Sequence, residues 1–111
     1  MKEDRDQLLL ERIIEAIQVI ETYVAGQTFE IFSREPKTLD AVLMQFMIIG
    51  EAANNISETL TLEHHDLPWH QIIGLRNEVA HGYFNIKPEI IWQTIQEDLP
   101  QLKEVVDKIL K

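Results

Sequence analysis

Residues 36–60 read PKTLDAVLMQFMIIGEAANNISETL, and their hydrophobic pattern is that of one long helix. Proline suits the first turn of a helix, because its missing N–H would have no partner there. We therefore expect a helix from about Pro36 to Leu60 with one face in the core. The apolar side chains of that face recur every three or four positions, at Leu39, Val42/Leu43, Phe46, Ile49/Gly50, Ala53 and Ile56.

The same helix carries a second apolar face, formed by Met44, Met47 and Ile48. In a chain of 111 residues, a helix that is apolar on two sides needs something else to cover the second one. A partner subunit is the most economical cover, so this face predicts a homodimer.

Before this helix, the sequence from Asp6 to Val24 has the same helical spacing. Gly26 follows, and glycine commonly ends a helix because it tolerates a positive φ. The segment Thr28–Glu35 has room for one or two helical turns before the long helix begins. The apolar positions of the first helix are Leu9, Ile13, Ala16 or Ile17, Ile20 and Val24.

After the long helix, the polar segment Thr61–Leu67 (TLEHHDL) predicts a linker. Pro68 then opens a helix that ends or loosens at Gly82, and Pro88 opens a final helix that Pro100 kinks or splits. No strand-like alternation and no repeat occurs. We expect an all-α, antiparallel bundle of four to five helices, folded as one domain over residues 1–111.

Charge limits what the protein can bind. Ten Lys and Arg against nineteen Asp and Glu give a formal net charge of −9. Such a surface repels phosphate, which excludes a non-specific nucleic-acid coat protein. RNA or a nucleotide would have to bind in a local pocket, not through the overall field.

The absence of cysteine excludes disulfide frameworks, thiolate zinc sites and cysteine nucleophiles, and it favours a reducing compartment. The first fourteen residues, MKEDRDQLLLERII, have no uninterrupted apolar run, unlike a signal peptide. The apolar stretch Ala41–Ile49 is interrupted by Gln45 and is far shorter than the ~20 residues that span a bilayer. We expect a cytoplasmic protein without a membrane partner.

One polar cluster suggests chemistry, the sequence RNEVAHGY from Arg76 to Tyr83. Arginine offers a fixed positive fork for phosphate, and histidine exchanges protons near neutral pH. On a helix, Asn77 and His81 share a face, whereas Arg76 and His81 diverge by roughly 140°. Two antiparallel copies of this helix across a two-fold axis would make one cleft with two arginines and two histidines. Without such a cleft, solvated or structural roles for both side chains are the alternative.

Two other features have simpler explanations. His64, His65, Asp66 and His70 resemble metal ligands, but a polar loop with Asp66 near a helix start explains them as well. Glu51 lies in an otherwise apolar stretch, and we expect it to have a polar partner in an ion pair or hydrogen bond. We predict no metal site and no cofactor.

The sequence LRNEVAHGYF from Leu75 to Phe84 closely resembles the R-x4-H-x-Y signature of the HepT-like (DUF86) branch of the HEPN superfamily. Two further elements match that family, Ile49-Gly50-Glu51-Ala52 in the long helix and Pro68-Trp69 followed by Ile72-Ile73-Gly74 before the arginine. Helix order and length agree too, so the resemblance covers essentially the whole chain.

The resemblance implies a HEPN-like dimer that acts as the RNase toxin of a toxin–antitoxin system and cleaves RNA without a metal. It implies that Arg76 and His81 are the catalytic pair and that Asn77 helps to shape the cleft. It also implies that Tyr83 is the residue that a partner, the MntA-type minimal nucleotidyltransferase antitoxin, modifies with AMP. A different class of function remains open, a non-catalytic helical protein that binds nucleotide or presents a substrate to such a nucleotidyltransferase.

Overall fold

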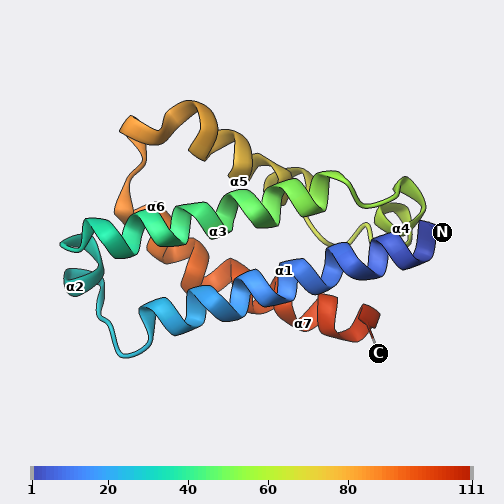
Figure 1. Ribbon diagram of the computed structural model, residues 1–111, viewed down its shortest axis with the longest axis horizontal. Coiled ribbons are helices and arrows are strands. Elements are labelled where there is room, and N and C mark those ends of the chain that lie inside the picture. The colour runs from blue at the N-terminus through green and yellow to red at the C-terminus, as the bar shows by residue number, and fades with distance from the viewer. Residues whose placement is uncertain (1, 111) are drawn as a thin grey trace.

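The computed structural model describes the backbone of residues 2–110 and the side chains of residues 4–110. Long helices lie side by side and alternate in direction, so that the first and last described turns end at the same side of the molecule (Figure 1). This part of the chain contains no strand, which confirms the predicted all-α antiparallel bundle. The long elements are α1 (Lys2–Val24), α3 (Pro36–Asn54), α5 (Trp69–Gly82) and the continuous run of α6 (Pro88–Gln93), the π-helical segment η2 (Thr94–Asp98) and α7 (Leu99–Leu110).

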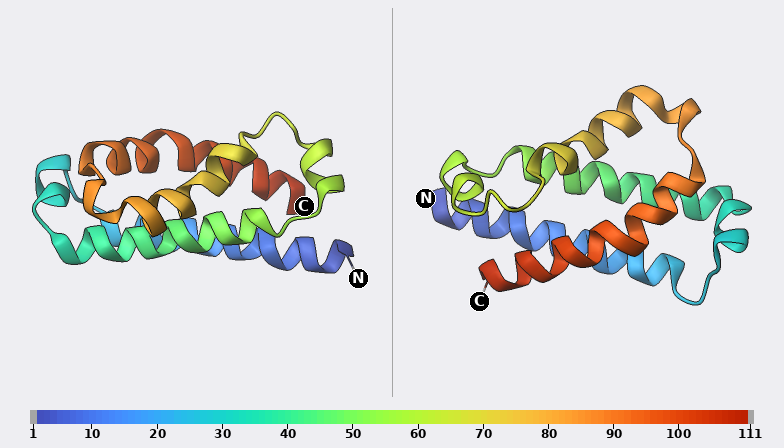
Figure 2. Two further views of the ribbon diagram at one scale, coloured as in Figure 1. Left: turned by 90° about the horizontal axis from the view of Figure 1, so that it is seen from above. Right: turned by 180° about the vertical axis from the view of Figure 1, so that it is seen from behind.

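Three short elements connect the long ones: α2 (Phe29–Ser33), α4 (Glu58–Glu63) and the 3₁₀ turn η1 (Tyr83–Asn85). The most extensive packing is that of α3, which lies between α1 and α5, and α7 closes the bundle against α1. Seen from behind, the C-terminal end of α5 and the turn after it stand away from the other helices (Figure 2, right).

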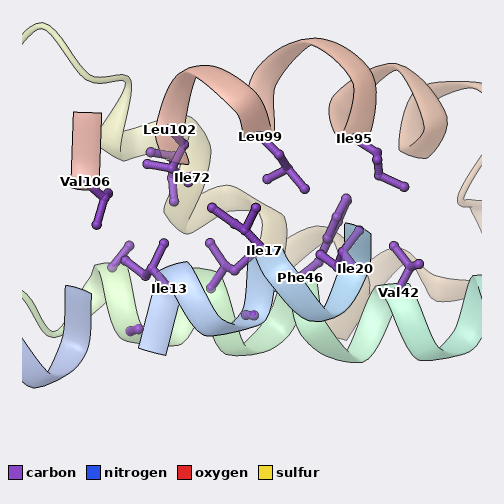
Figure 3. Close-up of a cluster of buried hydrophobic side chains, with 14 of the residues drawn as sticks. Ile13, Ile17, Ile20, Val42, Phe46, Ile72, Ile95, Leu99, Leu102 and Val106 are labelled. Atoms are coloured by element: carbon purple, nitrogen blue, oxygen red, sulfur yellow. The ribbon is translucent and has the colours of Figure 1, made fainter. Parts of the chain in front are cut away.

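One hydrophobic core joins these helices. Isoleucines of α1 meet Phe46 of α3, Leu99 and Val106 of the C-terminal run and Ile72 of α5 (Figure 3). Phe46 and Val106 are almost completely buried, which is the position the helical spacing predicts for them. The core therefore holds the apolar face of α5 against α3, and the polar face of α5 is turned outward.

The long helix ends earlier than its sequence suggests. It stops at Asn54, whereas the periodicity predicted a helix to about Leu60, and residues 58–63 form the separate helix α4. The break is stabilised by Asp6 of α1, whose carboxylate accepts hydrogen bonds from the backbone N–H (2.9 Å) and the hydroxyl of Ser57. Ser57 in turn caps α4 by accepting a bond from the N–H of Leu60.

The predicted linker Thr61–Leu67 is consequently wrong at its start, because α4 extends through Glu63. The stop after α1 is correct, since Gly26 has a φ of 75°, a conformation that glycine adopts easily.

Pro100 affects the last helix without splitting it. Proline has no N–H to donate to the carbonyl one turn earlier, and the five residues of η2 immediately before α7 are π-helical. In this wider turn the N–H of Leu99 bonds to the carbonyl of Thr94. Within residues 2–110, no helix combines the length and the apolar character that crossing a membrane would need.

Candidate functional site

The helices α3 and α5 approach each other closely at Gly50 and Arg76. A Cβ atom placed on Gly50 would lie 2.7 Å from the Cβ of Arg76 and 2.8 Å from its backbone nitrogen, closer than real Cβ contacts. Glycine is therefore required at this crossing, and it lets α3 support the backbone of Arg76 directly.

The guanidinium of Arg76 is held on two sides. Its Nε lies 2.7 Å from Oε2 of Glu51, and its Nη1 donates to Oδ1 of Asn77 at 3.3 Å. Asn55, which immediately follows α3, donates its side-chain amide to Oε1 of Glu51 at 3.3 Å. Nη2 has no acceptor in the described part of the chain, so it stays available to an anion.

This arrangement confirms that Glu51 has a polar partner, as its position in an apolar stretch predicted. The side chains of Glu51 and Arg76 are 55% and 42% exposed, so water reaches the pair.

A groove of about 430 Å³ opens beside the guanidinium, and we call it the α1–α3–α5 groove after the helices that form it. Arg12 of α1 lies in the same groove as Arg76 of α5. Among residues 4–110, the groove is lined by Leu9, Arg12, Met47, Ile48, Glu51, Ala52, Asn55 and Arg76.

His81 lies in the last turn of α5 with its side chain exposed. It does not line the groove that contains Arg76. Asn77, one turn before His81, is exposed as well. A single chain thus keeps the arginine and the imidazole on different faces of the helix, as the spacing predicted.

Tyr83 begins the turn η1 that follows α5. Its ring packs edge-on against Phe84 with ring centroids 5.3 Å apart, and its hydroxyl donates to Oδ1 of Asp40 at 2.7 Å. Tyr83 is 45% exposed and Phe84 is 95% exposed. The hydrogen bond to Asp40 raises the pKa of Tyr83 above its ordinary value, and the negative charge of Asp40 adds to this effect.

The partnership of Tyr83 with Asp40 could not be read from the sequence. Asp40 lies on α3, 43 residues earlier in the chain, and no local spacing connects the two residues. The sequence placed Gly50 on the core face of the long helix and predicted a polar partner for Glu51, but their contacts with Arg76 emerge only from the helix crossing.

The histidine-rich segment does not form a metal centre in the described residues, which contain no group of three or more potential ligands placed around one point. His64 instead accepts, through its backbone carbonyl, a hydrogen bond from the indole of Trp69 at 3.0 Å. A ring nitrogen of His65 lies 3.3 Å from the carbonyl of Leu62. These contacts suit a connection between α4 and α5.

Comparison with known proteins gives consistent results. A family model described as ribonuclease HepT-like matches residues 13–109. A probable ribonuclease HepT of Thermococcus cleftensis is 37% identical over 92% of this chain and 93% of its own length. A putative RNase of Caldanaerobacter subterraneus subsp. tengcongensis is 34% identical over 92% of this chain and 91% of its own length. No solved structure gives a significant match.

The family match covers both the helix crossing at Gly50 and the segment from Arg76 to Tyr83. This confirms the resemblance inferred from the sequence, and the chain belongs to the HepT-like ribonuclease family.

Proposed function

We propose that this protein is the toxin of a toxin–antitoxin system, a metal-independent endoribonuclease with Arg76 and His81 as its catalytic pair. The observation that carries the proposal is the guanidinium of Arg76, which Glu51 and Asn77 hold in place while Nη2 stays open to an anion. Membership of the HepT-like ribonuclease family supports the proposal independently.

RNA supplies its own nucleophile, the 2′-hydroxyl, so the protein needs to move protons and stabilise charge. His81 takes the proton of that hydroxyl or protonates the leaving 5′-oxygen, a role worth about 10²–10⁴ in rate. Arg76 neutralises the charge that grows on the phosphorane oxygens in the transition state. DNA lacks the 2′-hydroxyl and should not react.

The active form in this proposal is a homodimer. Within one chain the groove contains Arg76 but not His81, and a two-fold pairing of α5 helices would supply each cleft with both groups. Met44 and Ile48 of α3 support such a pairing, because they leave apolar side chains 56% and 37% exposed. Asn77 would shape the cleft between the two copies.

Regulation in this proposal acts at Tyr83. Tyr83 is an exposed residue of the turn after α5, where a second enzyme can reach it. An MntA-type minimal nucleotidyltransferase would transfer AMP from ATP to this oxygen and release pyrophosphate. The added nucleotide carries bulk and a negative charge near the RNA site and would block it.

The competing interpretation, a non-catalytic helical protein that binds nucleotide or presents Tyr83 to a nucleotidyltransferase, also explains an exposed tyrosine. It predicts modification of Tyr83 without any RNA cleavage by the unmodified chain.

The deciding experiment is a cleavage assay with purified, unmodified protein and a labelled single-stranded RNA, in buffer with EDTA. Cleavage should persist in EDTA, spare the DNA oligonucleotide of the same sequence, and disappear in Arg76→Ala and His81→Ala. His70→Ala is the matched control, since His70 is exposed on the same helix and lies outside the proposed site. Cleavage that survives in His81→Ala, or that EDTA abolishes, would contradict the mechanism.

A further inference from the structure

The α1–α3–α5 groove contains a second arginine that the motif around Arg76 does not include. Arg12 projects from α1, in a part of the sequence with no catalytic signature, and it lines the groove together with Arg76. Its side chain is exposed. The fold thus brings two of the four arginines of the chain to one concave surface.

The charges in this groove do not cancel. Among the described residues, Glu51 is the only acidic one that lines the groove, and both of its carboxylate oxygens are engaged, one by Arg76 and one by Asn55. Arg12 has no ion pair with any residue that the structure describes. The groove therefore offers a whole guanidinium and the open Nη2 of Arg76, in a chain whose formal net charge is −9.

The remaining walls are apolar. Leu9, Met47, Ile48 and Ala52 line the groove beside the two arginines. A ligand that carries both an anionic group and flat apolar faces fits these arginines and apolar walls better than a free inorganic ion does. A single RNA strand has that chemistry, with phosphates along one side and base faces that pack on apolar side chains.

We propose that Arg12 binds a phosphate of the RNA strand next to the one held by Arg76, so that the α1–α3–α5 groove is a substrate-binding subsite. This inference rests on the proposed ribonuclease function. Arg12 contributes affinity and Arg76 contributes to the chemical step, so that loss of Arg12 raises KM and leaves kcat nearly unchanged.

A second copy of this chain is the other occupant to consider, because Met47 and Ile48 belong to the apolar face of α3 that predicts a dimer. The charges argue against it. The proposed dimer already brings two copies of Arg76 to one cleft. These guanidiniums, and Arg12, which has no ion pair among the described residues, need an anion that an RNA phosphate supplies and the arginines of a second copy do not.

Binding can be measured apart from cleavage in the His81→Ala background, using a fluorescein-labelled single-stranded RNA and fluorescence anisotropy at several salt concentrations. Arg12→Ala should raise Kd about three- to tenfold and reduce the slope of log Kd against log salt by about 0.7, the share of one phosphate contact. Arg12→Lys should restore most of that slope. Arg5→Ala is the matched control, since Arg5 is an exposed arginine of the same helix outside the groove.

Light scattering on the same variants separates the two occupants. An unchanged Kd and salt slope in Arg12→Ala would overturn the subsite, as would a lack of RNA binding by the His81→Ala parent. A loss of affinity that accompanies a change of oligomeric state would identify the groove as an interface between copies instead. If Arg12 is needed for binding but the wild-type protein cleaves no RNA, the subsite stands and the proposed ribonuclease function fails.

Discussion

The two ends of the Arg76–Tyr83 segment are supported in different ways. At Arg76, α5 lies directly against α3, and Glu51 and Asn77 hold the guanidinium. At Tyr83, the chain has left the bundle, and the phenol hydroxyl connects it to α3 by donating a hydrogen bond to Asp40. A positioned cation and an accessible phenol suit the two tasks that we propose, charge stabilisation at Arg76 and regulation at Tyr83.

The largest expected effect is that of a substitution at the crossing of α3 and α5, because it should remove the support of Arg76. Gly50→Ala adds a Cβ that must displace the backbone of Arg76, whereas Gly74→Ala adds one with no atom within 4 Å. Both substitutions gain up to about 1 kcal/mol of helix propensity, so their difference isolates the clash. We expect Gly50→Ala to be less stable to urea than Gly74→Ala by about 1–3 kcal/mol.

RNA cleavage should fall in the same order, with Gly50→Ala impaired and Gly74→Ala close to wild type. If the two alanine variants proved equally stable, α3 would not support Arg76 as closely as the geometry indicates.

Local sequence patterns predict only part of the difference between the Arg76 and Tyr83 ends of the segment. Three-or-four spacing predicted the long helices and the core positions such as Phe46, because burial of an apolar face is encoded residue by residue. The end of α3 was missed because it depends on Asp6, which is distant in sequence and caps the turn at Ser57. The hydrogen bond between Tyr83 and Asp40 was missed for the same reason, because the two residues are distant in sequence.

The candidate site divides in the same way. Arg76, Asn77, His81 and Tyr83 are close together in the sequence, and a single motif identifies them. The carboxylate of Glu51 that orients the arginine comes from α3, and the second arginine of the groove comes from α1. Only the folded bundle brings these helices together.

Removing the ion pair between Glu51 and Arg76 should have a smaller effect than the clash at Gly50, and it tests whether Glu51 orients the guanidinium. Glu51→Gln keeps the shape of the side chain but removes the charge that orients the guanidinium, so kcat for RNA cleavage should fall about tenfold with little change in KM. Glu51→Asp should recover part of the rate. Single-turnover kinetics with saturating RNA measures this directly.

Glu15→Gln removes an exposed carboxylate of α1 outside the groove and is the matched control. It should retain the wild-type rate. A Glu51→Gln variant that lost thermal stability but kept its kcat would show that the ion pair supports the fold and does not position Arg76.

The smallest expected effect concerns the hydrogen bond at the other end of the segment. The carboxylate of Asp40 raises the pKa of Tyr83, so Asp40→Asn should lower that pKa toward the ordinary value for tyrosine. The chain has two tyrosines, and absorbance of the phenolate during an alkaline titration of Tyr23→Phe would report Tyr83 alone.

The sign of the linked stability follows from the direction of the shift. A phenol whose pKa is higher in the folded state binds its proton more tightly there, so its stabilising contribution is complete below the ordinary tyrosine pKa. That contribution is lost as the pH rises through the higher, folded-state pKa. Asp40→Asn should therefore lose less stability than the wild type over this alkaline window. Near neutral pH, where the contribution is complete, the wild type should be the more stable of the two, and the difference should shrink as the pH rises. A pKa of Tyr83 that did not fall in Asp40→Asn would mean that Asp40 does not hold the phenol in solution, and the turn η1 would then have even less attachment to α3 than the structure shows.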